Sequence, residues 1–152
     1  MDKEPRRYPE SMTAGSLGIQ VMREGIVRDA AVSWRFEEPF SWVVEVRGSG
    51  FGTAEARADD AFEALCLVRE ELEPFGWRIG VAGAQIDVWP SGMARDQGGG
   101  LRAYRMTSES VGDLVDTFAP VDPASVTTVA VQRAETERLY EAIRHRARTD
   151  ED

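Results

Sequence analysis

The amino-acid sequence predicts an α+β fold, with an antiparallel or mixed sheet, one central helix and a C-terminal helix packed on one face. Two observations predict this class. Several short segments alternate apolar and polar residues with a period of two, which is typical of half-buried strands. Residues 59–73 and 126–148 instead gather their apolar residues on one helical face, and such helices cover a sheet. A doubly wound nucleotide fold would need more regular alternation of strands and helices.

The length of 152 residues, 42% of them apolar and 30% charged, suits one globular domain. Residues 1–18 are polar and contain several Pro and Gly residues, so we expect a flexible N-terminal arm there. The single α+β domain is expected over residues 19–148, and a disordered tail over residues 149–152. The N-terminal segment has no apolar run, so neither a signal peptide nor a spanning helix is expected, and a cytoplasmic location is the simplest interpretation.

The first strands are expected in the N-terminal half. Residues 19–28 fit either a hairpin around Glu24-Gly25 or a helical turn. Residues 30–36 and 42–46 alternate clearly, and the segment 37–40 between them is typical of a hairpin turn. The sequence GSGFG at 48–52 ends the second of these strands and is interpreted as a bend into the following helix.

The helix expected over residues 59–73 carries one apolar stripe. Asp60 and Glu63 have the spacing of a capping box at its start. Pro74 and Gly76 then end it. The remaining expected elements are, in order, a strand over 77–81, a short continuation over 86–89, a loop over 90–100, a strand over 101–106, a last strand near 114–118 and a helix over 126–148 on the outer side of the domain.

The net charge of −9 limits the classes of partner. An acidic surface repels phosphate backbones and anionic lipids, so general nucleic-acid binding and membrane binding are not expected. The same charge attracts a basic protein partner, although ordinary solubility also explains it. Seventeen of the basic residues are arginine, Lys3 is the one lysine, and asparagine does not occur, which indicates the GC-rich genome of a bacterium.

Catalytic motifs are not found in the sequence: it contains neither a GxSxG elbow nor a Walker sequence. His145 lies among arginines on the last helix, where a solvated surface position is expected. Cys66, the single cysteine, lies on the apolar stripe of the first helix and is expected to be a buried, inert thiol. No cofactor or metal site is expected, although the carboxylates leave a magnesium site open. An enzyme is therefore less expected than a binding protein.

The loop WPSGMARDQGGGLRAY at residues 89–104 is the strongest candidate site. Three consecutive glycines permit positive φ angles and a close approach of another backbone or ligand. Three interpretations stay open: an anion pocket of glycine N–H groups and arginines, a protein-contact loop, and a structural loop in which Arg95 or Asp96 ties the turn to the protein's own backbone. The candidate binding residues are Trp89, Ser91, Met93, Arg95, Asp96, Gly98, Gly99, Gly100, Arg102 and Tyr104.

Residues 62–104 resemble an uncharacterised bacterial family that pairs an "FEAL…R..LE..GW" helix and strand with a "PSGM.RD.GGG..AY" loop. Residues 114–116 and Phe118 are similar to the segment that follows in that family, so the resemblance covers about residues 59–118. The family is loosely similar to orphan proteins of toxin–immunity gene clusters. Together, the acidic surface, the absence of a catalytic constellation and this resemblance favour a non-enzymatic binding protein, with an immunity-type inhibitor of a bacterial toxin as one role. We expect such a protein to meet its partner through helix 59–73 or loop 89–104. The alternative is a small anionic-ligand-binding domain or enzyme that uses loop 89–104.

Overall fold

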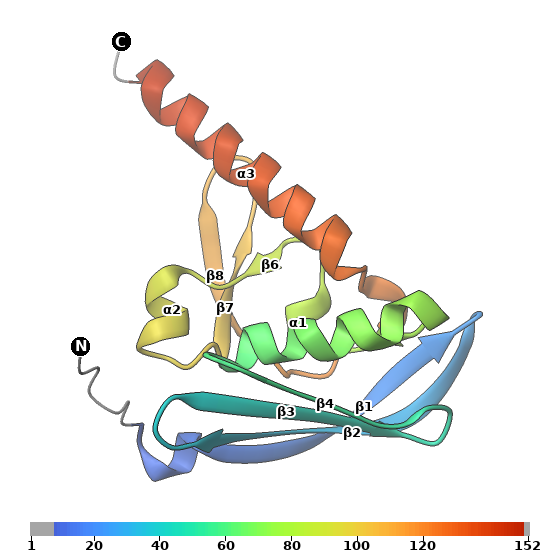
Figure 1. Ribbon diagram of the computed structural model, residues 1–152. Helices are drawn as coiled ribbons and strands as arrows, with labels where there is room; N and C mark the ends of the chain where they lie inside the picture. The colour runs from blue at the N-terminus through green and yellow to red at the C-terminus, as the bar shows by residue number, and fades with distance from the viewer. Residues whose placement is uncertain (1–7, 151–152) are drawn as a thin grey trace.

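The computed structural model describes residues 8–150, which form two antiparallel sheets and three α-helices (Figure 1). The predicted α+β class is confirmed, and the sheets are antiparallel. The first sheet has the strand order β4-β3-β2-β1-β5, and the second has the order β6-β7-β8. The strands of the first sheet are β1 (Ala14–Arg23), β2 (Ile26–Glu37), β3 (Ser41–Gly48), β4 (Gly52–Ala58) and β5 (Arg78–Ile79).

The first sheet begins earlier in the chain than expected. Residues 14–18, which we assigned to an N-terminal arm, form the first half of β1; residues 1–7 of that arm lie outside the described residues. The hairpin at Glu24-Gly25 is confirmed, with positive φ angles of 53° and 77° at its two central residues, as a two-residue hairpin turn requires. The hairpin between β2 and β3 is also confirmed.

The segment 48–52 does not lead into the helix, so that prediction is wrong. It turns the chain back, and β4 pairs with β3 along its whole length. In β4 the residues Ala54, Ala56 and Ala58 alternate with the exposed Thr53, Glu55 and Arg57. This alternation does not predict a strand from the sequence, because alanine is only weakly apolar and is depleted in strands.

Helix α1 (Ala61–Leu72) packs on β3 and β4, and its predicted capping is confirmed. The Asp60 carboxylate accepts a hydrogen bond from the Glu63 N–H over 2.8 Å. The core of the sheet lies against this helix, as Figure 1 shows. Its largest fully buried apolar side chains include Trp42, Leu65 and Ile79.

The second sheet consists of β6 (Val88–Trp89), β7 (Arg102–Met106) and β8 (Val111–Asp116). The strand expected over 77–81 contributes only the two residues of β5, and the last strand begins at Val111, earlier than expected. The segment 90–100 is not entirely a loop, because it contains the short helix α2 (Gly92–Asp96). Its glycines at both ends hid this helix from the sequence analysis.

Helix α3 (Val129–Asp150) begins against the second sheet and extends past it (Figure 1). Its first half buries Val129, Gln132, Thr136 and Leu139. Thr149 and Asp150 continue the helix, whereas we expected a disordered tail from residue 149; residues 151–152 of that tail lie outside the described residues. None of the helices in residues 8–150 combines the length and the apolar composition that crossing a bilayer requires.

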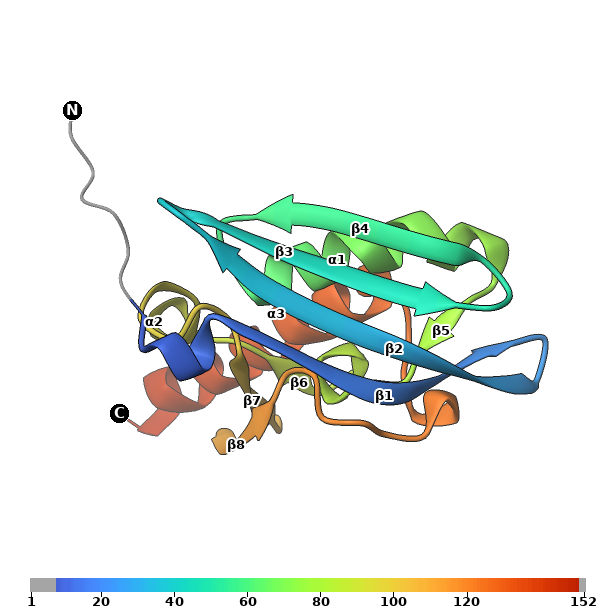
Figure 2. The same cartoon turned by 90° about the horizontal axis from the view of Figure 1, so that it is seen from below.

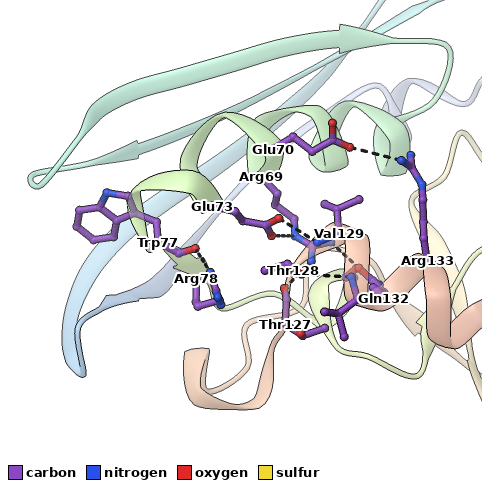
Figure 3. Close-up of polar contacts among 12 residues, drawn as sticks. Arg69, Glu70, Glu73, Trp77, Arg78, Thr127, Thr128, Val129, Gln132 and Arg133 are labelled. Carbon is purple, nitrogen blue, oxygen red and sulfur yellow. Dashed lines mark hydrogen bonds and ion pairs between the residues drawn. The ribbon is translucent and has the colours of Figure 1, made fainter.

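A buried polar network joins α1 to α3 (Figure 3). The Arg69 side chain is fully buried and donates to Gln132 Oε1 over 2.6 Å, to the Thr127 carbonyl over 2.7 Å and to Glu73 Oε2 over 3.2 Å. Glu73 Oε1 accepts from the Val129 N–H over 2.9 Å. Burial lowers the pKa of Arg69 and raises the pKa of Glu73. Because every member has a partner, the network fixes the start of α3 over the end of α1.

Candidate functional site

Arg95, a central residue of the candidate loop, is bound by the protein itself. Its Nη1 lies 3.1 Å from Asp60 Oδ2 and 3.5 Å from Glu63 Oε2. Its guanidinium also lies over the rings of Phe62 and Trp89, 5.3 and 5.5 Å from their centroids. Arg95 therefore ties α2 to the start of α1, as in the structural-loop interpretation, but through carboxylates rather than the backbone.

The three glycines serve close packing. Gly99 and Gly100 have positive φ angles of 65° and 73°, and a Cβ on Gly100 would lie 2.6 Å from Asp60 Oδ1 and 2.7 Å from the backbone N of Phe62. The Gly99 carbonyl accepts from the Ala61 N–H over 2.7 Å, at the first turn of α1. The N–H groups of Gly98 and Gly100 both donate to the Ala94 carbonyl. These two donors are therefore engaged, which weakens the anion-pocket interpretation of the loop.

Two further residues of the candidate loop also have structural roles. The Ser91 hydroxyl accepts from the Ala94 N–H over 3.0 Å and so caps α2. The Asp96 carbonyl accepts from the Tyr8 hydroxyl over 3.3 Å. Ser91 and Asp96 thus fix the two ends of α2.

The other predicted residues, Met93, Gly98, Arg102 and Tyr104, come together along one cleft of about 930 Å³. The cleft lies between the N-terminal half of β1, helix α2 and one face of the second sheet. Figure 2 shows β1 running beside α2, β7 and β8 at this place. We refer to it below as the β1–β8 cleft.

The floor of the β1–β8 cleft is aromatic. The rings of Trp34 and Phe118 stack with centroids 4.5 Å apart and an interplanar angle of 7°. Gly15 makes room for this arrangement, because a Cβ there would lie 2.3 Å from Cζ2 of Trp34. Leu101 also lines the cleft and packs against the main core. The floor is therefore a continuation of the core that reaches the surface.

One wall of the cleft is a face of the second sheet. Tyr104 pairs with Leu114, and Arg102 pairs with Asp116, in the β7–β8 register. All four residues line the cleft. The intervening Ala103 and Val115 point to the opposite face, where the second sheet packs against α1 and α3. The second sheet therefore has a buried face toward the helices and a more exposed face toward the cleft.

The polar groups of the cleft are few. Arg102 Nε lies 3.4 Å from Asp116 Oδ1, and both side chains are mostly exposed. Ser11, Gln97 and Tyr104 are further polar residues of the lining, whereas Ser16 borders the cleft with its backbone, because its side chain points to the opposite face from that of Leu17. Neither histidine nor cysteine lines the cleft within the part of the chain that the structure describes. The arrangement offers an apolar floor with hydrogen-bonding groups at its edges.

The other chemically notable residues lie elsewhere. Cys66 is buried in α1, and burial raises the pKa of its thiol to about 12. His145 is exposed on α3. Among residues 8–150, no group of three or more His, Cys, Asp or Glu side chains is arranged to hold a metal ion.

The acid-rich helix α1 is less open than its composition suggested. Arg133 of α3 lies 3.3 Å from Glu63 Oε1 and 3.6 Å from Glu70 Oε1, the latter visible in Figure 3. Two of the acids of α1 are thus partly covered by α3. Of the two contact surfaces predicted from the sequence, helix 59–73 and loop 89–104, the loop is the more exposed.

The sequence analysis missed the half of the cleft that lies outside residues 89–104. Leu17, Trp34, Leu114 and Phe118 come from β1, β2, β8 and the segment after β8. The alternation around Trp34 indicated a strand, but it carried no signal that the strand borders a cleft.

No protein-family model matches the chain, and no curated protein matches it either. The resemblance of residues 59–118 to a bacterial family stays a prediction.

Proposed function

We propose that this protein is a non-enzymatic binding protein of the bacterial cytoplasm, and that it holds part of a partner protein in the β1–β8 cleft. The cleft itself carries the proposal: its volume of about 930 Å³ lies over a stacked aromatic floor. Binding sites are typically concave, mostly apolar and supplied with a few polar groups that fix orientation.

A protein partner suits the exposed apolar rim. Leu17, Met93 and Leu114 border the cleft and are 40%, 68% and 47% exposed. Exposed apolar side chains that gather around one cleft are typical of interaction surfaces. An anionic small molecule suits the cleft less, because Arg102 already faces Asp116 and Arg95 is bound by Asp60 and Glu63.

The net charge of −9 favours a basic partner, whose approach it would accelerate. An immunity-type inhibitor of a bacterial toxin is the role that the family resemblance favours. In that role the protein would occupy a surface of the toxin, and the cleft would supply the apolar centre of the contact.

Site-specific photocrosslinking in the producing cells tests the proposal. A photoreactive amino acid replaces Met93 on the cleft rim or Phe75 beyond α1, and both native side chains are 68% exposed. We expect one discrete crosslinked protein from position 93 and none from position 75. Equal crosslinking from both positions, or no adduct from position 93, would refute the proposal.

A further inference from the structure

Among the residues that the structure describes, the first half of strand β1 has an unpaired edge beside the cleft. The strand pairs with β2 from Ala14 to Arg23, but with β5 only at Val21 and Met22. The Gln20 carbonyl accepts from the Gly80 N–H over 2.8 Å, at the end of that short contact. Within residues 8–150, no strand lies against the first half of β1 on that side.

The direction of the free backbone groups follows from the pairing. The Thr13 carbonyl accepts from the Phe36 N–H of β2, whereas the Gln20 carbonyl faces the opposite side. Because peptide groups alternate sides along an antiparallel strand, Ala14, Ser16 and Gly18 direct their N–H and C=O groups to the open side with Gln20. All three residues are exposed.

This edge lacks the devices that usually block one. Exposed edges are commonly protected by charged residues, proline or a bulge. Residues 14–18 read AGSLG and pair with β2 without a register shift. A Cβ on Gly18 would point to the outer face of the sheet and would meet nothing within 4 Å, so no side chain covers that face of the strand. The edge can therefore accept another strand.

We propose that the partner's segment binds as an added β-strand along residues 14–18, an inference that rests on the proposed function. Main-chain hydrogen bonds to the open edge would supply affinity, and alternate side chains would supply specificity. Leu17 pairs with the buried Val32, so its side chain lies on the cleft side of the sheet. Alternate side chains of the added strand would enter the cleft on that side and contact Tyr104 and Leu114, which calls for an extended segment with apolar residues at every second position.

The charges around the edge define the segment further. Asp29 and Asp122 lie with Gly18 around a second hollow at one end of the edge, and Glu10 precedes the cleft-lining Ser11 at the other. These three carboxylates have no ion-pair partner within residues 8–150. A segment with a basic residue at each end complements them, whereas a second copy of this acidic chain would bring like charge.

Peptide titration followed by amide nuclear magnetic resonance tests the inference. The probes are blocked heptapeptides of pattern Lys-φ-Thr-φ-Thr-φ-Lys, with Val, Ile or Phe at φ. We expect at least one to give saturable shifts at the amides of Ala14, Ser16 and Gly18. N-methylation of the peptide residues that face β1, or replacement of both lysines by glutamate, should weaken binding about tenfold.

A matched pair of protein variants gives an independent readout. Ser16→Pro removes an outward N–H and leaves the β1–β2 hydrogen bonds intact, since proline is tolerated where an edge N–H faces solvent. Ser16→Ala keeps that N–H and removes only the hydroxyl, which points away from the cleft because the neighbouring Leu17 points toward it. We expect about tenfold weaker peptide binding for Ser16→Pro and unchanged binding for Ser16→Ala. If Ser16→Pro does not fold, the binding of the N-methylated peptides to the wild-type protein tests the inference instead.

Two outcomes would overturn the inference. One is that no peptide of the pattern binds at about 1 mM, the weak limit for such contacts. The other is that peptides shift Tyr104 and Leu114 but tolerate N-methylation and Ser16→Pro. The second outcome would leave cleft binding intact and reject only strand addition, whereas the crosslinking experiment at Met93 decides on the proposed function itself.

Discussion

Trp34 and Phe118 lie face to face, with ring centroids 4.5 Å apart and planes 7° from parallel. Trp34 belongs to β2 of the first sheet, and Phe118 follows β8 of the second. Stacked aromatic pairs contribute about 1 kcal/mol beyond the burial of their area. The contact therefore joins the two sheets at the place where the β1–β8 cleft opens.

Phe118→Ala tests this joint. Phe118 is buried, and its truncation removes the stack and leaves a cavity, so we expect the free energy of unfolding to fall by about 3 kcal/mol in urea denaturation. Phe75→Ala is the control, because Phe75 is an exposed phenylalanine and should change stability by less than about 0.5 kcal/mol. Similar small losses in both variants would show that the stack does not hold the sheets together.

Gly100→Ala tests the structural role of the triple glycine. The substitution forces alanine to a φ of +73° and its Cβ against backbone and carboxylate atoms of α1, so we expect a loss of about 2 kcal/mol or more. Gly92→Ala is the matched control in the same loop, where a Cβ meets nothing within 4 Å. It should be neutral or slightly stabilising in helix α2. Thermal or urea unfolding of the two variants gives the comparison, and equal stabilities would contradict it.

Local signals in the sequence were sufficient for much of the fold. The apolar stripe and the Asp60–Glu63 capping spacing located α1 to within about two residues, because they depend on contacts only a few residues apart. The alternation around Trp34 and Val44 located β2 and β3 for the same reason. Strand β4 was missed because its inward residues are alanines, and β1 because glycines interrupt its first half.

The site was harder to predict because it depends on distant pairings. Loop 89–104 contributes residues to the cleft, but half of the cleft comes from other segments, including Leu17, Trp34 and Phe118. Arg95 and Arg102 lie in the same loop, and the sequence alone gives no reason to assign them different roles. Their environments differ only in the folded protein. One meets the buried Asp60 carboxylate and the other reaches the surface.

Arg95→Ala and Arg102→Ala should therefore have different effects. Arg95→Ala leaves the buried Asp60 carboxylate without its cation and should cost about 2 kcal/mol of stability. Arg102 is 64% exposed and its ion pair is solvated, so Arg102→Ala should cost less than about 0.5 kcal/mol. Urea denaturation of both variants is the measurement. If Arg102→Ala were the more damaging change, the assignment of the two arginines would be wrong.

The buried thiol of Cys66 gives a prediction for alkaline pH. Burial raises its pKa from 9.0 to about 12, so the folded protein keeps the thiol protonated over a range in which the unfolded chain ionises it. The contribution of the protonated thiol to the free energy of unfolding is fully present below pH 9. It is lost as pH rises toward 12, at about 1.4 kcal/mol per pH unit. Cys66→Ala has no thiol to ionise, so the stability difference between wild type and variant should shrink over this range, while all other titrating groups cancel.

Alkylation with iodoacetamide at pH 8 checks the same group directly. Only about one folded molecule in ten thousand would carry the thiolate at that pH, and the buried thiol is shielded from the reagent. We expect labelling only at the rate at which the protein unfolds, and complete labelling in denaturant. Cys66 lies on the inner side of α1, where it packs against the second sheet and the start of α3. Rapid labelling of the folded protein would therefore mean that α1 opens locally.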